Sequence, residues 1–549
     1  MSTKLTPEAT YSRFACIGAG CSGIGLGATL KRWYGITDIQ FFERHGGLGG
    51  TWYTNRYPGC ACDVPSALYS YSFEPNPEWT HILPCQDELK SYVTRVADKY
   101  GLIPKINFGV DVEACEWIEE RHVWRLRVRR GADEISYHES QFLFSGTGHF
   151  STPRGIDVPG AASFKGPIFH SSRWQDVDLT EKRVVVFGNG STASQIIPSI
   201  VKKTKHTTQI VRAKHWIMPP IDRSIPKRIR RLLRWVPGTM GLFRFIVFLA
   251  AEDSLRGFPM TKAAARYRKR QRVSCEAYMR ETAPKRYHNI LIPDFEVGCK
   301  RRVFDSGYLK SLHEDNLTLT NTRALEILPD GVRTSQGIIL ADVIVLANGF
   351  ITSHYLNQVE MIGRGGKTAS QHWKKMGGAT AYNSSVLSGF PNFFMLLGPN
   401  SATGHTSGLM AIENSINYAL RVIKPILDGE ATIIDLKPQA ELEYTNRVQG
   451  ALDKTVWNSG CSSWYVQDDG KGKKWNAMSY PWSQGYYWYR SLFPKWRDWR
   501  YYGEVQRRPR LNWARVLAIA GVFFVGVWWT WYQNVDCKVV AATFRSLSV

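Results

Sequence analysis

Residues 13–27 read RFACIGAGCSGIGLG, and residues 39–43, IQFFE, follow after a predicted helix. The apolar run Phe14–Ile17 is typical of a buried parallel strand, and Ile39–Phe42 predicts a second one. The glycines between them have the spacing GxGxxG and are Gly18, Gly20 and Gly23. In a dinucleotide-binding unit the first glycine lets the strand turn, the second lets backbone approach a pyrophosphate, and the third lets the helix pack.

An acidic residue completes this first motif. Glu43 ends the second predicted strand, about twenty residues after the last glycine, where such units bind a ribose hydroxyl. Glycines, flanking strands and the acid together predict a complete dinucleotide-binding unit, and the acid suits FAD.

A second dinucleotide motif begins at Arg183–Phe187 (RVVVF). It continues as GxGxxA through Gly188, Gly190 and Ala193, ahead of a predicted helix. The next predicted strand, Thr208–Val211, ends not on an acid but on Arg212, with Lys214 nearby. A cation at that position suits the 2′-phosphate of NADP, and the alternative for Arg212 is a solvated surface charge.

These motifs predict an α/β fold with two Rossmann-like dinucleotide-binding domains, and other stretches of the sequence predict a helical insertion and a C-terminal transmembrane helix. The expected boundaries are 1–155 for the first segment of the FAD domain, 156–330 for the NADPH domain with its insertion at about 217–294, 331–505 for the return of the FAD domain and a C-terminal region, 513–533 for the transmembrane helix, and 534–549 for a short tail. Residues 1–12 are polar and are expected to be loose.

Composition narrows the possible classes of function. The chain has 549 residues, 44% of them hydrophobic, with 20 Trp, as expected for a globular protein. Its net charge of +23 would suit nucleic acid, an anionic membrane or phosphorylated cofactors, but no nucleic-acid-binding motif accompanies it. The ten cysteines are scattered without metal-ligand spacing, so reduced thiols and no metal site are expected.

The C-terminal region contains the uncharged run Val516–Tyr532, long enough to span a bilayer. Tryptophans lie at both ends of the run, and arginines concentrate before it, at Arg507, Arg508, Arg510 and Arg515. This asymmetry predicts a single-pass anchor with the catalytic domain facing the cytosol, with the endoplasmic reticulum as the expected membrane. The alternatives are a buried helix and a helix lying in the membrane interface.

The insertion Ile217–Asp294 combines a basic run, KRIRRLLR at 227–234, with an apolar run, Met240–Ala251, that Arg244 interrupts. We expect helices that cover the substrate site or touch a membrane surface.

Two further stretches carry a resemblance to a known family. Residues 164–174, FKGPIFHSSRW, fit FxGxxxHxxxW through Phe164, Gly166, His170 and Trp174, and residues 49–63 read GGTWYTNRYPGCACD. From about Arg13 to Ser407 the chain resembles the class B flavoprotein monooxygenases, specifically the Baeyer–Villiger monooxygenases. The related N- and S-oxidising enzymes usually carry Tyr in place of Trp174. One departure is that Gln175 stands between Trp174 and Asp176, where the Baeyer–Villiger pattern has Pro or Asp directly.

The resemblance implies the site residues. Arg301, in GCKRRVF, would be the catalytic cation over the flavin, and Asp63 would orient it. Arg302 is the other candidate for this role. The alternative for both arginines is a cluster of surface charges without a function in catalysis. His170 would support cofactor orientation. The residues implied to bind FAD are Gly18, Gly20, Gly23, Glu43, Thr51, Trp52, Asp63 and Tyr69. Those implied to bind NADP are Gly188, Gly190, Ser191, Thr192, Arg212, Lys300 and Trp464.

The implied reaction uses NADPH to reduce FAD, and oxygen then forms a flavin C4a-peroxide that inserts one oxygen atom beside a ketone. The alternative within the superfamily is oxidation of nitrogen, sulfur or activated carbon. A disulfide reductase would need a CxxxxC motif, and only Cys60-Ala-Cys62 is present. A membrane scaffold would leave two nucleotide motifs unexplained. The anchor suggests a lipophilic small-molecule substrate, such as a polyketide or terpenoid intermediate of specialised metabolism.

Overall fold

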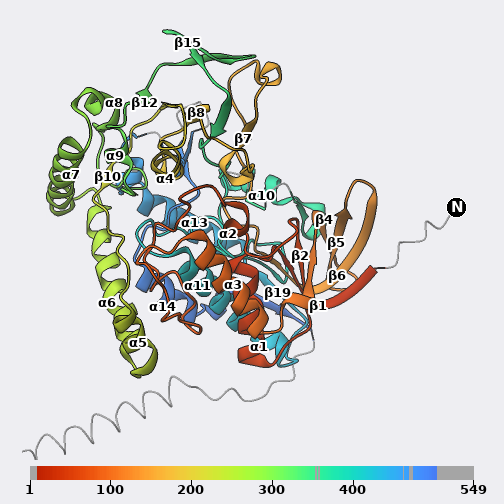
Figure 1. The fold of residues 1–549 in the computed structure, drawn as a ribbon. Coiled ribbons are helices and arrows are strands. Elements are labelled where there is room, and N and C mark those ends of the chain that lie inside the picture. Colours follow the sequence, from red (N-terminus) through yellow and green to blue (C-terminus); the bar gives the residue numbers. More distant parts are fainter. Residues whose placement is uncertain (1–8, 353–354, 357–358, 462, 469–473, 504–549) are drawn as a thin grey trace, which may run out of the picture.

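Two sheets organise the chain, and each carries one of the glycine motifs (Figure 1). The computed structural model describes residues 9–352, 355–356, 359–461, 463–468 and 474–503. The largest cluster of buried apolar side chains includes Phe14 and Leu26 from the first unit and Val184 and Ile196 from the second. The two units therefore share one continuous core.

The first sheet has the order β17-β4-β5-β6-β1-β2-β3, with β18 also paired to β6. Its strands are β1 (Ala9–Ile17), β2 (Ile39–Glu43), β3 (Ile106–Phe108), β4 (Val110–Ile118), β5 (Val123–Arg130), β6 (Glu134–Ser145), β17 (Glu360–Ile362) and β18 (Phe393–Met395). β1 pairs in parallel with β2 and with β6, as a dinucleotide-binding unit requires, while β4 and β5 form an antiparallel hairpin. The helices α1 (Cys21–Tyr34), α3 (Gln86–Lys99) and α11 (Gly408–Val422) pack beside one another on this unit.

The second sheet has the order β12-β9-β8-β16-β7, with every pairing parallel. Its strands are β7 (Ile168–His170), β8 (Arg183–Phe187), β9 (His206–Ile210), β12 (Leu317–Thr320) and β16 (Val343–Leu346). Helix α4 (Ser191–Ile200) follows β8, as the GxGxxA motif predicts. A three-stranded antiparallel sheet lies between β12 and β16 in sequence and consists of β13 (Ala324–Leu328), β14 (Gly331–Thr334) and β15 (Gly337–Leu340).

The predicted insertion is helical. It lies between β10 (Ile217–Met218) and β11 (Val303–Phe304), which pair in parallel at its base. Its helices are α5 (Lys227–Trp235), α6 (Thr239–Asp253), α7 (Lys262–Thr282) and α8 (His288–Leu291). In Figure 1 these helices line one side of the molecule, with α5 at the far end of α6.

The remaining elements surround the two sheets. The helices are α2 (Thr51–Thr54), α9 (Tyr308–Ser311), α10 (Ala369–Met376), α12 (Lys424–Leu427), α13 (Pro438–Leu452) and α14 (Gln484–Leu492). The strands form two antiparallel pairs, β19 (Ile433–Leu436) with β22 (Trp499–Tyr502) and β20 (Val466–Asp468) with β21 (Lys474–Asn476).

The predicted transmembrane helix at 513–533 and the tail at 534–549 lie outside the described residues. Within the described ranges, no single helix has the length and apolar content needed to cross a bilayer. The pair formed by residues 227–235 and 239–257 meets those criteria together, but it is bent by 113°.

One pair of cysteines departs from the expectation of reduced thiols. Cys299 and Cys461 form a disulfide across 162 residues of sequence, so that expectation was wrong for these two. The fold brings them together because Cys299 lies near the end of the insertion, where the C-terminal region packs against it. Cys16, Cys21, Cys60, Cys62, Cys85, Cys115 and Cys275 are free.

The start of β1 also departs from expectation, because Ala9–Ser12 is paired to β6 rather than loose. His138 of β6 explains the difference. It is 3% exposed, and its ring nitrogens lie 2.8 Å from the hydroxyl oxygens of Thr10 and Ser12. Ser12 Oγ donates to Phe14 O, so the His138 Nε2–H donates to Ser12 and Nδ1 accepts from Thr10. The polar residues at the start of β1 are thereby satisfied inside the sheet.

This environment predicts a pH-dependent contribution to stability. Burial lowers the pKa of His138 from 6.5 to about 4, so the unfolded chain takes up a proton before the folded chain does as the pH falls. We expect the free energy of unfolding to fall by about 1–3 kcal/mol between pH 6.5 and pH 4 because of this group. Urea denaturation of His138→Gln should show a shallower loss over that range, whereas His81→Gln, at an exposed position, should follow the wild type. Parallel curves for all three proteins would contradict this assignment.

Candidate functional site

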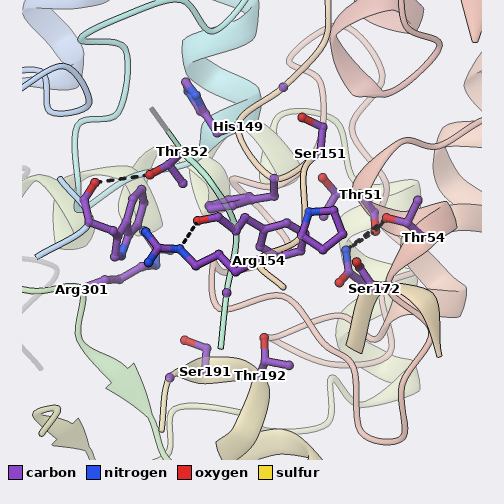
Figure 2. Close-up of a pocket in the computed structure, with 18 of the residues that line it drawn as sticks. Thr51, Thr54, His149, Ser151, Arg154, Ser172, Ser191, Thr192, Arg301 and Thr352 are labelled. Atoms are coloured by element: carbon purple, nitrogen blue, oxygen red, sulfur yellow. Dashed lines mark hydrogen bonds between the residues drawn. The ribbon is translucent and has the colours of Figure 1, made fainter. Parts of the chain in front are cut away.

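A single cavity of about 1550 Å³ lies between the two glycine loops. Gly18 and Gly20 line it from the first unit, Gly188 and Gly190 from the second, and Arg301 from the end of the insertion. Figure 2 shows Thr51 and Thr54 on one side of this cavity, Ser191 and Thr192 on another, and Arg301 apart from both. The two predicted nucleotide sites therefore open into one space.

The first glycine loop has the geometry that its sequence predicts. Gly18 has a φ of +99°, and a Cβ there would lie 2.8 Å from the Gly146 carbonyl oxygen. Gly20 precedes α1, and no side chain caps that helix. The amide groups of the first turn of α1 are thus left to donate to an anionic group in the cavity.

Glu43 is held rigidly at the end of β2. Its carboxylate accepts hydrogen bonds from the Ala19 amide at 2.8 Å and from the His45 amide at 3.0 Å. The residue is 4% exposed and lines the cavity. An acceptor fixed at this point could bind a hydroxyl group of a nucleotide ribose.

Three further residues implied to contact FAD also lie on the cavity wall. Thr51 and Trp52 belong to α2, and Tyr69 lies in the following loop. The indole N–H of Trp52 donates to the Tyr69 hydroxyl at 3.0 Å, and the two rings meet edge to face. This contact fixes the orientation of both aromatic groups beside the first glycine loop.

The second glycine loop is open toward the cavity. Gly188 has a φ of +128°, and a Cβ there would lie 2.1 Å from the Ala347 carbonyl oxygen. At Gly190, by contrast, a Cβ would meet nothing within 4 Å. Ser191 and Thr192 begin α4, again without a side-chain cap, and both line the cavity. These features can accommodate a second phosphate group.

Arg212 follows β9 and lines the same cavity. Among the described residues no carboxylate forms an ion pair with it. A guanidinium without an acidic partner next to a phosphate-binding loop can bind a second phosphate.

Asp63 and Arg301 form a bidentate ion pair on the cavity wall. Arg301 Nε lies 2.7 Å from one carboxylate oxygen of Asp63, and a terminal nitrogen lies 2.7 Å from the other. Burial alone would raise the pKa of Asp63, but the charge and hydrogen bonds of Arg301 outweigh it, so this pKa lies below the usual range. The charge of Asp63 in turn raises the pKa of Arg301, which keeps the guanidinium protonated.

Arg302, the competing candidate, lies elsewhere. It borders a small separate cavity with Tyr267 and Arg268 and is not among the residues that line the large one. Of the two adjacent arginines, the geometry therefore brings only Arg301 to the nucleotide sites.

Lys300 and Trp464 also line the large cavity. The Lys300 ammonium lies 4.7 Å from the centre of the Phe295 ring, and burial lowers the pKa of this lysine. The Trp464 ring packs against Tyr465 at 4.4 Å, and its carbonyl oxygen accepts a hydrogen bond from Thr352. Both residues implied to contact NADP thus line the same cavity as the second glycine loop.

The FxGxxxHxxxW residues support the cavity from outside. His170 is buried, its Nδ1 accepts from the Ser172 amide at 3.1 Å, and its Nε2 lies 3.0 Å from the Gly349 carbonyl oxygen. It thereby ties β7 to the loop after β16. Phe164, Gly166 and Trp174 pack nearby, and none of the four motif residues lines the cavity. This placement fits a supporting rather than a chemical role.

Sequence reasoning missed several cavity residues. His149 and Arg154 lie in the loop after β6, and Arg154 donates to the Phe350 carbonyl oxygen at 3.0 Å (Figure 2). Tyr57 donates to Gln195 of α4 at 2.8 Å and so joins the two units. The glycines and proline around His149 and Arg154 could have indicated a functional loop, but nothing in the sequence pairs Tyr57 with Gln195.

The chain is similar in sequence to proteins of known family. A model of the NAD(P)-binding Rossmann-like domain matches residues 16–84. A Baeyer–Villiger monooxygenase of Streptomyces coelicolor is 35% identical over 84% of this chain and 88% of its own length. A Baeyer–Villiger monooxygenase of Pseudomonas aeruginosa is 33% identical over 85% and 88%, and the FAD-binding monooxygenase ktnD of Aspergillus niger is 33% identical over 84% and 78%.

Solved structures share the fold at lower identity. Cyclohexanone monooxygenase from Rhodococcus sp. Phi1 bound to NADP+ superposes with a TM-score of 0.79 at 24% identity, over 90% of this chain and all of that one. OTEMO in complex with FAD and NADP gives a TM-score of 0.78 at 24% identity with the same coverage. The chain therefore belongs to the Baeyer–Villiger monooxygenases, a family of FAD-binding, NADPH-dependent oxidoreductases.

Proposed function

We propose that the protein inserts one atom of O2 beside the carbonyl group of a lipophilic ketone and so forms an ester or lactone. The observation that carries this proposal is the Asp63–Arg301 pair on the wall of the cavity that both glycine loops share. Oxidation of nitrogen, sulfur or activated carbon is the alternative outcome for the same cofactors.

The described residues fit FAD in the first unit and NADPH in the second. Gly20 and Gly190 leave uncapped helix starts that face the cavity, Glu43 offers a fixed acceptor, and Arg212 offers a cation without an acidic partner. When bound, FAD would accept hydride from NADPH and activate O2 for transfer to the substrate. Lys300 and Trp464 would contact the nicotinamide side of the cavity.

Arg301 would stabilise the negative charge that develops on the oxygen atoms of the reacting ketone. Asp63 fixes two of its nitrogens, so the guanidinium is oriented before the substrate arrives and needs no reorganisation during the reaction. Because Asp63 also keeps the group protonated, its charge is constant across the working pH range.

The substrate and the cellular location are proposed from the sequence. The apolar run at 516–532 would anchor the chain in a membrane, with the catalytic part facing the cytosol and the endoplasmic reticulum as the expected compartment. A lipophilic ketone of specialised metabolism would be concentrated at such a surface.

Replacing Arg301 tests the chemical role. Arg301→Ala should lower the rate of ketone oxygenation about 100- to 1000-fold, the cost of removing a preorganised electrostatic donor. The rates of ester formation and NADPH oxidation are measured in parallel, and we expect NADPH oxidation to continue with release of hydrogen peroxide. Arg301→Lys should recover only part of the loss, because it cannot form the bidentate pair.

The matched control is Arg302→Lys, at the neighbouring position away from the large cavity, which should keep oxygenation within a few-fold of the wild type. Full oxygenation of ketones by Arg301→Ala would exclude the proposed role. Products from amines or sulfides alone would instead favour the alternative reaction.

Replacing Arg212 tests the nucleotide preference. Arg212→Ala should raise the KM for NADPH about tenfold or more, the loss expected for a charge-assisted hydrogen bond of 1.5–3 kcal/mol, and leave the KM for NADH nearly unchanged. Lys205→Ala, an exposed cation just before β9, is the control. Equal effects on both nucleotides would show that Arg212 does not contact the 2′-phosphate.

The anchor is tested by charge insertion. Phe523→Arg with Val525→Arg places two charges in the apolar run, each costing about 2.5–3.5 kcal/mol at a bilayer centre, and should abolish resistance of the membrane-bound protein to alkaline carbonate extraction. Ala541→Arg with Ala542→Arg, in the tail, should leave extraction unchanged. Extraction of the wild-type protein by carbonate would exclude a spanning helix.

A further inference from the structure

We propose that the outward faces of α5 and α6 form a surface that lies on bilayers containing anionic lipid. We call it the α5–α6 face and define it by Arg228, Arg231, Leu232, Trp235, Leu242, Phe245, Ile246 and Leu249. The proposal concerns a part of the chain separate from residues 513–533, and it rests neither on the predicted anchor nor on the proposed reaction.

The apolar part of this face is a single stripe on α6. Leu242, Phe245, Ile246 and Leu249 stand at positions i, i+3, i+4 and i+7, so they share one side of the helix. Between 51% and 60% of each of these four residues is exposed. An amphipathic helix normally turns such a stripe toward a protein core, and here the stripe points outward.

Buried polar contacts hold the opposite side of α6 against the protein. Arg244 donates to the carbonyl oxygens of Ala67 at 2.7 Å and Ser70 at 2.8 Å, and it lies 3.8 Å from Glu413. At the C-terminal end of α6, Glu252 accepts a hydrogen bond at 2.9 Å from the Gln484 amide. Turning the apolar stripe inward would break these contacts, carry Arg244 away from the protein and leave the Glu413 carboxylate without this cation.

Glu252 also connects α6 to the large cavity. It lies 2.9 Å from Nε2 of His405, whose neighbours Gly404 and Thr406 line that cavity. The helix that carries the exposed stripe therefore touches the loop that bounds the site, and a membrane under α6 would lie next to the region that receives the substrate.

Helix α5 adds positive charge to the face. Arg228, Arg231, Leu232 and Trp235 share one side of α5, and Trp235 is 72% exposed. The other side is held by Arg230 and Arg234, which lie 3.8 Å and 3.4 Å from Glu78. Among the described residues, Arg228 and Arg231 have no acidic partner. Cations beside an exposed tryptophan and an apolar stripe are typical of helices that lie in a membrane interface.

The charge of the α5–α6 face favours contact with lipid over contact with a second copy of the chain or with the C-terminal segment. Residues 227–251 contain no aspartate or glutamate. A second copy of the chain in a symmetric pair would bring this face, which has cations and no acidic residue, against the same face of its partner, and like charges repel. The C-terminal segment brings Arg507, Arg508, Arg510 and Arg515 ahead of its apolar run, again of the same sign. Anionic lipid headgroups supply the complementary charge, and acyl chains accept the apolar stripe.

The geometry also favours a helix lying on the membrane over one that spans it. Together the two helices have the length and composition of a span, but they bend by 113°. A pair bent this strongly can lay both outward faces along one surface, whereas a straight crossing would bury Arg244 and Glu252 in lipid.

The test measures the depth of individual positions in the full-length protein. The fluorescent amino acid Anap replaces Ile246 or, as a control, the equally exposed Ile338 of β15. Each protein is reconstituted in vesicles of phosphatidylcholine with phosphatidylserine, with and without brominated acyl chains. We expect a blue shift and several-fold stronger quenching by bromine at position 246 than at 338.

Charge reversal separates the face from any other membrane attachment. In the Ile246→Anap protein, Arg228→Glu with Arg231→Glu should lower the quenching at 246 toward the level at 338, while Arg266→Glu with Arg270→Glu, two exposed positions of α7, should not. Phosphatidylcholine alone should also weaken the quenching, because it removes the complementary charge. Hydrogen exchange provides a second measurement on the wild-type protein, without substitutions. The anionic vesicles should slow the exchange of backbone amides in α5 and α6.

Three results would overturn the proposal. Equal quenching at 246 and 338 would mean that the face has no preferred contact with lipid. A blue shift at 246 without quenching would mean that another part of this chain or a second copy covers it. Unchanged hydrogen exchange in α5 and α6 would mean that neither helix lies on the bilayer. None of these readouts depends on ketone oxygenation, so they remain informative if the proposed reaction is wrong.

Discussion

The ion pair between Asp63 and Arg301 is the contact on which the organisation of the site depends. Asp63 belongs to the loop of the first nucleotide unit and Arg301 to the end of the insertion, 238 residues later. Each side chain faces the cavity, with exposures of 25% and 32%, and neither has a comparable partner. Removing one partner would leave the other charged and only partly solvated, so the pair holds both segments in place. A cation so placed is rigid before any ligand arrives.

The two ends of the insertion must lie side by side for Arg301 to reach the cavity. Its ends are joined where Ile217 of β10 pairs with Val303 of β11, two residues beyond the arginine. The disulfide from Cys299 to Cys461 ties the other side of Arg301 to the segment that carries Trp464. Closing so long a loop costs conformational entropy, and these two ties restrict the loop beside Arg301 rather than at the distant helices. The insertion can therefore carry surface functions on α5 and α6 without displacing the guanidinium.

Local features of the fold were predictable from the sequence, and long-range ones were not. The GxGxxG and GxGxxA loops, their strands and the acid at Glu43 follow from glycine geometry and apolar periodicity, which act over a few residues. The pairing of Asp63 with Arg301 was predicted only through family resemblance, because no local rule relates residues so far apart. The disulfide and the Tyr57–Gln195 hydrogen bond were missed for the same reason. The start of β1 was missed because its polar residues are satisfied by His138, from a strand more than 120 residues away.

Arg244 shows that a sequence can identify an apolar helix correctly without showing which way the apolar side of that helix faces. In the sequence it interrupts an apolar run and weakens the case for a membrane span. In the structure it is the residue that determines which way the run faces, because its guanidinium is bound by backbone carbonyl oxygens of the first unit. Hydrophobic periodicity gives the width and spacing of an apolar stripe but not whether core or bilayer covers it. On α6, the inward position of Arg244 determines the orientation of the helix, and the apolar stripe therefore faces away from the protein.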